Sequence, residues 1–576
     1  MALRNTSYTN PILPGWHTDP SCTFVAEWDN TFFLTTSSFL TFPGCPVFAS
    51  KDLVNWRLAS NALSRREQVP EFFTLSSGQQ QEGIWASTLR YHNGKFYLIT
   101  SFISYKTEWR PVIFLFTTED PYDDAAWSSP LRIDNPGNDI DPDIFWDDDG
   151  QAYMAVAAGI WLSKVNLKTG AASAPVSIWR GSGNRNPEGP HIYKKDGYYY
   201  LLLAEGGTEM GHCATIARSR SITGPYEGYA GNPILTATGT NAYFQTVGHA
   251  DLFQDAAGNW WAIALATRSG PAWENYPMGR ETVLTPVRWE KGGWPVLEPI
   301  RGQMHGPVPA ATRSLPGAGP FVADGDVEDF KQGSPIPRHF VFWRPPKASL
   351  FSISPPGYPD TLRMLPSRTG LSGDIDFEPD IDGLSFISRR QTSTLFSFSV
   401  DLSFQPTELE EEAGVTVFLT QQQHIDLGIV NLPLCSDDSI SPRLRFRVEA
   451  SGKPDAAVPQ VTIVPLPKHW PRESVRLQIA TESDTFYVFS AAPVDDPEDS
   501  RTVGFASAEI VSGGTGPFTG TLIGAYATSN GGNGTTPAYF SRWRYTPMAQ
   551  EISAGEFVST ETRRQEKSRA KTVARI

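Results

Sequence analysis

One β-hairpin pattern recurs through the first half of the chain, and it constrains the fold more than any other feature. Each copy has a short apolar strand, a polar turn that contains glycine, and then a strand rich in aromatic residues, as in a β-hairpin. Four copies follow the pattern closely: GIWASTLRYHNGKFYLIT (83–100), IDPDIFWDDDGQAYMAV (140–156), NPEGPHIYKKDGYYYLLLA (186–204) and VGHADLFQDAAGNWWAIALA (247–266). A looser fifth copy, DPSCTFVAEWDNTFFLTTSS, occupies residues 19–38 and turns at Asp29-Asn30.

Five such units predict a five-bladed β-propeller over residues 1–305. The copies lie about 50 to 60 residues apart, which leaves room for about four strands and their loops in each unit. A propeller closes radially and leaves only short, protected sheet edges. A β-sandwich is the alternative, because similar hairpins build sandwiches too. We favour the propeller because the hairpins carry functional side chains at one matching position.

That position lies nine residues before each turn glycine. Counting back from Gly94, Gly150, Gly197 and Gly258 gives Trp85, Asp141, Glu188 and His249, and Asp19 lies ten residues before Asp29 in the looser copy. Propeller blades superpose by rotation about a central axis, so equivalent positions converge on one ring. The repeat therefore predicts that Asp19, Asp141, Glu188, Trp85 and His249 meet near the axis.

Three carboxyl groups around one small pocket predict acid–base chemistry. Like charges in close proximity raise the pKa of one member, which then keeps its proton. A protonated carboxyl beside an ionised one is what hydrolysis of a glycosidic bond requires. The alternatives are that these acids only cap turns, that Trp85 and His249 belong to the core, or that the ring binds Ca²⁺. Calcium prefers carboxylate and carbonyl oxygens, so His249 would act there through a bound water.

The composition narrows the possible partners. The net charge is −14, which disfavours nucleic acid and anionic membranes. Aromatic residues make up 12% of the chain, and their flat faces suit a neutral sugar. No run of 18 apolar residues is present, so we expect no membrane span. The first residues, MALRNTSYT, lack the apolar core of a signal peptide, and the compartment stays open. The four cysteines show no zinc-ligand spacing.

The second half has a different organisation. Residues 306–325 are rich in Pro, Gly and Ala and predict a linker. Residues 326–548 contain β-rich segments such as TLFSFSVDLSF (394–404) and AGVTVFLTQ (413–421), which predict a β-sandwich. Residues 549–576 have few apolar side chains and a basic end, so we expect a disordered tail.

The chain resembles glycoside hydrolase family 43, whose members are inverting five-bladed propeller enzymes that act on pentose polysaccharides. The resemblance lies in NPILPGWHTDPS (10–21), IDPDIFWDDDG (140–150), NPEGPHIYKKDGYYYL (186–201), SSFLTFPG (37–44), GIWAS (83–87), GHADLF (248–253) and YPMGRET (276–282). The resemblance implies that Asp19 is the general base, Glu188 the general acid and Asp141 the group that modulates the pKa of that acid. It also implies that Phe39, Phe42, Trp85, Arg280 and His249 bind the sugar.

The same resemblance implies a concanavalin A-like, lectin-like sandwich after the propeller, which in such relatives packs on the propeller and lends a loop to the pocket mouth. A purely stabilising sandwich is the alternative. Two departures from many β-xylosidases of the family affect the pocket rim: the phenylalanine loop lacks a Trp, and Ser87 follows the Trp-Ala pair where many have Pro. The preference between xylose and arabinose therefore stays open.

The predicted function is release of xylose or arabinose from the ends of xylan or arabinoxylan chains by a single displacement. The two reacting carboxyls should lie roughly 6.5 to 9.5 Å apart so that a water fits between them. We expect no required cofactor, with structural Ca²⁺ near His249 as the one possibility. The alternatives are a carbohydrate-binding propeller without catalysis and a retaining or transglycosylating enzyme.

Overall fold

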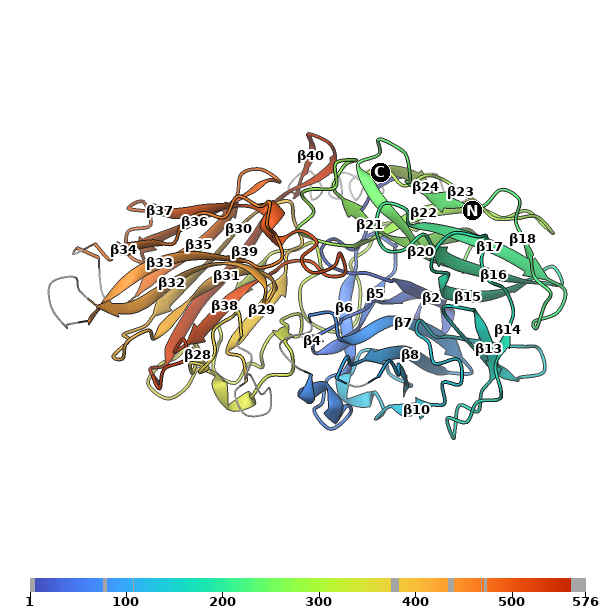
Figure 1. Ribbon diagram of the computed structural model, residues 1–576, viewed down its shortest axis with the longest axis horizontal. Coiled ribbons are helices and arrows are strands. Elements are labelled where there is room, and N and C mark those ends of the chain that lie inside the picture. Colours follow the sequence, from blue (N-terminus) through green and yellow to red (C-terminus); the bar gives the residue numbers. More distant parts are fainter. Residues whose placement is uncertain are drawn as a thin grey trace, which may run out of the picture.

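Two all-β domains lie side by side in the computed structural model, which describes residues 6–75, 80–106, 108–373, 383–433, 440–467, 469–470 and 474–560 (Figure 1). The N-terminal domain is the ring of blades on the right of the view, and the C-terminal domain is the layered pair of sheets on the left. Both the predicted propeller and the predicted sandwich are confirmed. Within the described residues, no helix is of the length and apolarity that a bilayer crossing needs.

Five antiparallel sheets of the described chain form the propeller, and each is built from strands that are close in sequence. The first blade consists of β2 (Ser21–Val25), β3 (Thr31–Thr35), β5 (Gly44–Ser50) and β6 (Arg57–Leu63). The second consists of β7 (Gly83–His92), β8 (Lys95–Ile103), β9 (Val112–Thr118) and β10 (Leu131–Ile133). The third consists of β11 (Asp143–Trp146), β12 (Ala152–Val156), β13 (Trp161–Lys164) and β14 (Val176–Ser177). The fourth consists of β15 (Glu188–Lys195), β16 (Tyr198–Glu205), β17 (Cys213–Ser219), β18 (Glu227–Gly228) and β19 (Leu235–Thr236). The fifth consists of β20 (Phe244–Gln254), β21 (Trp260–Arg268), β22 (Glu281–Arg288) and β23 (Val296–Leu297).

The predicted hairpin turns lie between the first and second strands of the blades. Gly94, Gly150, Gly197 and Gly258 have φ values of 81°, 79°, 75° and 82°, a backbone conformation that suits glycine. In the first blade, Asp29 and Asn30 both have a φ of 53° and take over this role. Short 3-10 helices interrupt the loops at η1 (Ala26–Trp28), η2 (Pro70–Thr74) and η3 (Asp124–Ala126), and later at η4 (Ala348–Leu350) and η5 (Ala508–Val511).

The two ends of the propeller sequence meet in a small sheet. Strand β1 (Thr6–Thr9) pairs antiparallel with β24 (Gln303–Gly306), which brings the start of the chain to the end of the fifth blade. The following segment, residues 306–325, packs on the first blade instead of crossing open solvent. Val322 N donates to Trp56 O at 2.9 Å, and the Arg57 guanidinium donates to Leu315 O and lies over the Phe321 ring.

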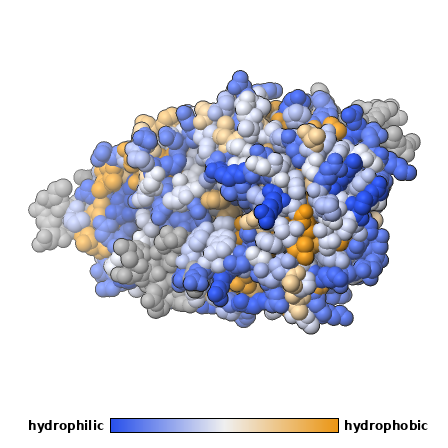
Figure 2. All heavy atoms as spheres, turned by 45° about the vertical axis from the view of Figure 1, so that its right-hand side comes forward, coloured by the Kyte–Doolittle hydropathy of each residue, from blue (hydrophilic) through white to orange (hydrophobic). Residues whose placement is uncertain are grey.

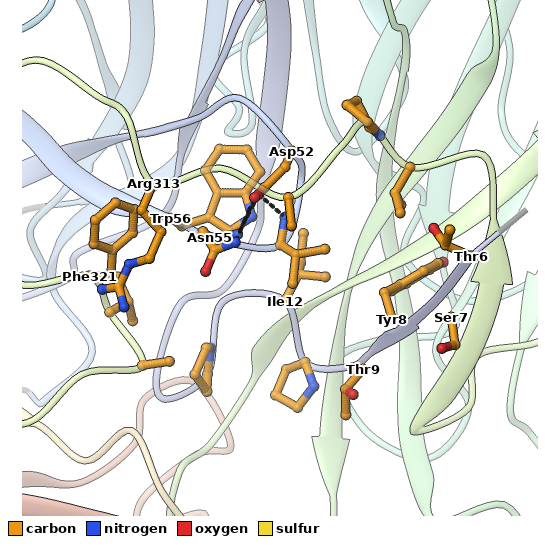
Figure 3. Close-up of a pocket in the computed structure, with 18 of the residues that line it drawn as sticks. Thr6, Ser7, Tyr8, Thr9, Ile12, Asp52, Asn55, Trp56, Arg313 and Phe321 are labelled. Carbon is orange, nitrogen blue, oxygen red and sulfur yellow. Dashed lines mark hydrogen bonds between the residues drawn. The ribbon is translucent and has the colours of Figure 1, made fainter. Parts of the chain in front are cut away.

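A cavity of about 740 Å³ lies where this segment meets β1 and the first blade (Figure 3). Asp52 is the buried acid in its wall, and it accepts hydrogen bonds from the backbone of Val54, Asn55 and Thr312 and from the Asn55 side chain. None of the three predicted catalytic acids lines this cavity. Asp52 is therefore fully used in holding two loops together, which is a structural role.

The C-terminal domain is a sandwich of two antiparallel sheets with a continuous apolar core between them. One sheet contains β29 (Phe386–Arg390), β38 (Leu522–Thr528), β31 (Glu412–Thr420), β32 (Gln423–Pro433), β33 (Ile440–Ala450) and β34 (Thr462–Pro465). The other contains β27 (Phe351–Ile353), β28 (Leu362–Met364), β39 (Ala538–Ser553), β30 (Leu395–Ser403), β35 (Val475–Thr481), β36 (Phe486–Pro493) and β37 (Arg501–Ser507), with β25 (Asp326–Glu328) and β40 (Glu556–Ser559) paired to β39. Alternate side chains of β35 are buried, as expected for a strand with one face on the core.

The sandwich is joined to the propeller through strand pairing and buried polar contacts. Strand β26 (Phe342–Trp343) pairs with β4 (Thr41–Phe42) of the first blade's loop. Figure 2 shows a mainly hydrophilic face over the molecule, with hydrophobic residues in small separate groups. One buried apolar cluster contains residues of both domains, among them Phe39, Trp343 and Phe418, so the domains bury apolar surface between them.

The segment from residue 549 to residue 560, predicted to be disordered, is ordered. Strand β39 continues to Ser553, and β40 returns along it. Arg268 of the propeller donates to Gln550 Oε1 and to Glu551 O, both at 2.8 Å, and Ile552 is buried. Low hydrophobicity misled the prediction because this strand is fixed by buried polar contacts. Residues 561–576 lie outside the described residues.

The cysteines that the structure describes are Cys22, Cys45 and Cys213, and all three are buried free thiols. Burial raises the pKa of Cys45 to about 12, so this thiol stays protonated. Cys435 lies outside the described residues.

Candidate active site

The start of the inner strand of each blade turns sharply at the predicted ring. Asp19 lies just before β2, Asp141 just before β11, and His249 lies within β20, and their φ values are 52°, 55° and 46°. In the second and fourth blades the positive φ belongs to the residue after the ring residue: Ala86 (31°) follows Trp85, and Gly189 (56°) follows Glu188. Such backbone conformations are costly for residues other than glycine, and they gather at functional sites. The five blades thus share one backbone irregularity at one depth.

Bulges accompany these turns in three of the blades. The pairing register shifts between Trp85 and Thr88, between Glu188 and His191, and between Gly248 and Asp251. A bulge changes the direction in which a strand presents its side chains, and bulges are common next to active sites. This local geometry allows side chains of the ring to face a pocket instead of the sheet.

Asp19 is buried and surrounded by donors. Its Oδ1 lies 3.2 Å from Arg280 Nη1, and its Oδ2 accepts a hydrogen bond of 2.6 Å from Ser37 Oγ. Thr18 Oγ1 donates to Oδ1 at 3.0 Å, and His249 Nδ1 lies 3.5 Å away. Burial alone would raise the pKa of Asp19, but the charge of Arg280 and the other donors outweigh burial and lower the pKa. This carboxylate is ionised at neutral pH.

Glu188 has the opposite electrostatic character. Burial, and then the negative charge of Asp19, raise the pKa of Glu188 to about 7, with partial compensation by Arg280. Burial and the charges of Glu188 and Asp19 also raise the pKa of Asp141. Gly189 N donates to Asp141 Oδ2 at 3.1 Å and favours its ionised form. The three acids therefore hold at least one proton near neutral pH, next to an ionised Asp19.

Aromatic rings enclose this acidic centre. Phe39 and Ile84 form an isolated β-bridge, which places the Phe39 ring 5.8 Å from the Trp85 ring. The Phe518 ring lies 6.1 Å from Phe39 and stacks against Trp85 at 6.2 Å with an interplanar angle of 17°. Phe42 lies elsewhere: it pairs with Phe342 of β26, and its ring contacts that of Phe73. The contacts of Phe42 thus belong to the domain interface, and the prediction that it walls the sugar pocket gains no support from them.

Phe518 reaches the site from the sandwich, and sequence reasoning missed this residue. Its carbonyl oxygen accepts hydrogen bonds from Arg280 Nε at 3.4 Å and Nη2 at 3.3 Å, and the Arg280 guanidinium lies 5.5 Å from the centre of its ring. Gly279 and Gly520 permit the close approach, since a Cβ atom on Gly279 would lie 2.4 Å from Thr519 O. The available signal was SGGTGPFTG (512–520), a glycine-rich loop with one aromatic residue.

A second charged layer, also missed, lies deeper along the same inner strands. Arg90 Nη2 is 2.9 Å from Asp143 Oδ1, and Arg90 Nη1 is 3.0 Å from Asp251 Oδ2. His191 Nδ1 lies 3.0 Å from Arg90 Nη2, and Tyr193 OH donates to Asp251 Oδ1 at 2.7 Å. Burial opposes the Asp251 charge, but Arg90 outweighs it and lowers the pKa of Asp251. This layer joins the blades below the ring. Its signal in the sequence was the aspartate that lies two residues after Asp141 and again two residues after His249.

The possible Ca²⁺ near His249 stays a prediction. No group of three or more His, Cys, Asp or Glu side chains in the described part of the chain is arranged to hold a metal ion. Burial lowers the pKa of His249 to about 4, so its imidazole is neutral, and its neighbour Asp19 already has the cation Arg280 as a partner.

An ionised carboxylate, a buried carboxyl that keeps its proton and an aromatic enclosure define a hydrolase site on a five-bladed propeller. Residues 8–295 match Glycosyl hydrolases family 43, and residues 327–546 match the Beta xylosidase C-terminal Concanavalin A-like domain. The chain belongs to glycosyl hydrolase family 43 and is an O-glycosyl hydrolase. The resemblance found in the sequence is thereby confirmed.

Similar proteins span nearly the whole chain. A non-reducing end alpha-L-arabinofuranosidase of Bacteroides ovatus is 33% identical over 546 residues, which cover 94% of this chain and 95% of the relative. A beta-xylosidase of Bacillus subtilis is 28% identical over 575 residues, covering 93% of this chain and 99% of the relative. The crystal structure of a family 43 protein from Bacillus licheniformis matches with a TM-score of 0.78 and 28% identity, covering 94% of this chain and 100% of that one.

Proposed function

We propose that this hydrolase inverts configuration and releases xylose or arabinose from the ends of xylan or arabinoxylan chains. The observation that carries the proposal is the opposite displacement of two pKa values within one ring. Arg280 and its neighbours lower the pKa of Asp19, whereas burial and Asp19 raise the pKa of Glu188 to about 7. One group is therefore ready to accept a proton while the other is ready to donate one.

Asp19 acts as the general base. It takes a proton from a water molecule, and the water oxygen forms a bond to the anomeric carbon from the face opposite the leaving group. Hydrogen bonds from Ser37 and Thr18 fix the carboxylate so that it can aim at one water. The positive charge of Arg280 keeps Asp19 ionised, which a base at neutral pH requires.

Glu188 acts as the general acid. As the bond from the anomeric carbon to the leaving oxygen breaks, Glu188 gives its proton to that oxygen, and the shortened chain departs as an alcohol. Asp141 modulates this step, because its negative charge raises the cost of ionising Glu188. The hydrogen bond from Gly189 N to Asp141 Oδ2 partly opposes the burial that raises the pKa of Asp141. The family resemblance, not this contact, assigns the transferred proton to Glu188.

The enclosure of the site supports terminal cleavage. Phe39 is 2% exposed, and Phe518 closes the pocket from the second domain. A site that is walled on these sides accepts the end of a chain more readily than its middle. The pentose assignment rests on the named relatives, one an arabinofuranosidase that acts at non-reducing ends and one a beta-xylosidase. We also assign Trp85 and His249 to binding of the sugar.

Replacement of each reacting acid tests these roles. We expect Asp19→Asn and Glu188→Gln each to lower kcat on aryl pentosides by about 10² to 10⁴-fold, the usual contribution of a positioned acid or base. NMR of the first product should show the inverted anomer. Full activity of Glu188→Gln, or a first product with retained configuration, would overturn the mechanism.

A substrate series tests the sugar. Initial rates on an aryl β-xyloside, an aryl α-arabinofuranoside and arabinoxylan oligosaccharides should identify at least one pentoside as the best substrate. Aryl hexosides are the matched control, because they differ from the pentosides by an additional hydroxymethyl group that a pentose-specific pocket should exclude. Faster cleavage of a hexoside than of both pentosides would refute the pentose assignment.

A further inference from the structure

A row of aromatic rings leads from the acidic centre to the protein surface. Phe39 is 2% exposed and contacts Trp85, which is partly exposed. The Trp85 ring lies 6.3 Å from the Trp109 ring, which in turn lies 6.3 Å from the Tyr105 ring. Trp109 is 43% exposed and Tyr105 is 40% exposed. The row therefore has a buried end at Phe39, near the carboxyl groups, and an exposed end at Trp109 and Tyr105.

The open end of this row is held in place. Tyr105 N donates to the buried Glu82 Oε1 at 2.6 Å, and Ser104 Oγ donates to the same oxygen at 3.3 Å. Asn138 Nδ2 donates to Trp109 O at 3.3 Å, and Asn138 precedes the ring residue Asp141 by three positions. Both exposed rings thus belong to a loop that is anchored to the second and third blades, which reduces the entropy that binding would cost.

The surroundings of the two rings suit a carbohydrate. Glu108 and Arg110, on the same loop, have side chains that are 89% and 77% exposed. Aromatic faces pack against the apolar faces of a sugar ring, and neighbouring polar groups can bond its hydroxyls. Large exposed aromatic residues that continue directly from an active site are more informative than isolated ones, which are common on protein surfaces.

We propose that Trp109 and Tyr105 form a stacking site for the leaving-group side of the substrate, which is the next pentose units of the xylan backbone. This inference rests on the proposed function. The sugar to be released occupies the enclosed part of the pocket, between the carboxyl groups and the rings of Phe39, Trp85 and Phe518. The remaining chain must then extend from that pocket toward solvent, and the aromatic row follows the same direction.

Kinetics of Trp109→Ala on oligosaccharides test the site. Xylotriose and an arabinoxylan oligosaccharide probe the leaving-group side, whereas free xylose and arabinose, as competitive inhibitors, probe the enclosed pocket alone. We expect kcat/KM on the better oligosaccharide to fall about tenfold and the inhibition constant of the free sugar to change less than twofold. Tyr105→Ala should act in the same direction with a smaller effect, and Trp109→Phe should retain most of the activity.

Tyr358→Ala is the matched control, because Tyr358 is 45% exposed and stacks on Tyr539 in the sandwich, away from this row. It should leave both measurements unchanged. An unchanged kcat/KM for Trp109→Ala, or an equal loss of free-sugar binding, would refute the stacking site while leaving the proposed function intact. A wild-type enzyme that released neither pentose from any of these substrates would instead refute the proposed function itself.

Discussion

The propeller and the sandwich each bury a cluster of acidic side chains, and they treat those charges in opposite ways. In the sandwich, Glu412 contacts the guanidinium groups of Arg445 and Arg447, and Asp426 accepts from His424 Nδ1 at 2.9 Å. Burial opposes these charges, but the basic neighbours outweigh it and lower the pKa of both acids. In the propeller ring, the pKa of Glu188 and Asp141 is raised.

The difference lies in the number of cations within reach. Two arginines contact the two acids in the sandwich, whereas Arg280 contacts only Asp19 among the three acids of the ring. An under-compensated buried acid costs stability, and it is retained where it supplies a proton. A buried acid cluster thus indicates a catalytic role when the pKa values of its members diverge. It indicates a structural role when every acid has a basic partner.

Glu412→Gln should produce the largest change in stability. It removes the buried carboxylate that Arg445 and Arg447 share, which leaves Arg445 with Glu410 and Arg447 with Asp426. Loss of one partner from a buried ion pair typically costs about 3 to 5 kcal/mol. Denaturant unfolding of the sandwich measures the loss. Activity per folded molecule should stay within twofold. An unchanged free energy of unfolding would contradict the structural role assigned to the acids of the sandwich.

Glu188→Gln should have the reverse effect on stability. The folded-state pKa of Glu188, about 7, exceeds the usual pKa of a glutamate in an unfolded chain. Ionisation of Glu188 therefore lowers the free energy of unfolding, by an amount that grows between about pH 4.5 and pH 7 and is constant above pH 7. Glutamine removes that cost. We expect the free energy of unfolding at pH 8 to rise by about 1 to 3 kcal/mol, and to be nearly unchanged at pH 4. A variant that is less stable at pH 8 would contradict the raised pKa.

Ser37→Ala should change the pH profile of the reaction. Ser37 Oγ donates to Asp19 at 2.6 Å and accepts from Ala86 N at 2.7 Å, so it positions the base against the second blade. Without that hydrogen bond the pKa of Asp19 rises, and the acidic limb of kcat/KM against pH should move to higher pH. The expected loss at the optimum is about tenfold, near the value of one hydrogen bond to a charged group. Thr18→Ala, which removes a 3.0 Å bond, should move the limb less. An unmoved limb in Ser37→Ala would contradict this positioning role.

The alkaline limb of the wild-type profile should report Glu188. A general acid is active while protonated, so kcat/KM should fall as pH rises through about 7, by about tenfold for each further pH unit. Asp141→Asn removes a neighbouring negative charge and should move this limb to lower pH. A limb that Asp141→Asn does not move would show that Asp141 has no influence on the acid.

Much of the fold followed from local sequence signals. A turn glycine and the strands on either side form a short-range pattern, and its repetition at similar spacing predicted five blades. The ring position followed from the same offsets, and the structure places Asp19, His249 and Arg280 in contact. The offsets worked because symmetry-related blades put equal sequence positions at equal depth.

Contacts between distant segments were beyond that reasoning. Phe518 lies 433 residues after Trp85, with which it stacks, and no periodicity links the two (518 − 85 = 433). Arg90 binds acids of other blades, a relation that depends on how the blades close. The resemblance placed Phe42 at the pocket beside Phe39, and that placement stays a prediction, because the contacts found for Phe42 are its pairing with Phe342 and the Phe73 ring. The tail appeared too polar to fold, yet its partners are buried polar groups of the propeller.

The position of Phe518 has a consequence for synthesis. Domains form from the N-terminus as a chain leaves the ribosome. The propeller emerges complete with Asp19, Asp141 and Glu188 while the wall that Phe518 supplies is still untranslated. A product cut short before residue 518 keeps every reacting acid but has an unfinished pocket. Completion of the pocket thus requires translation of the sandwich as far as Phe518.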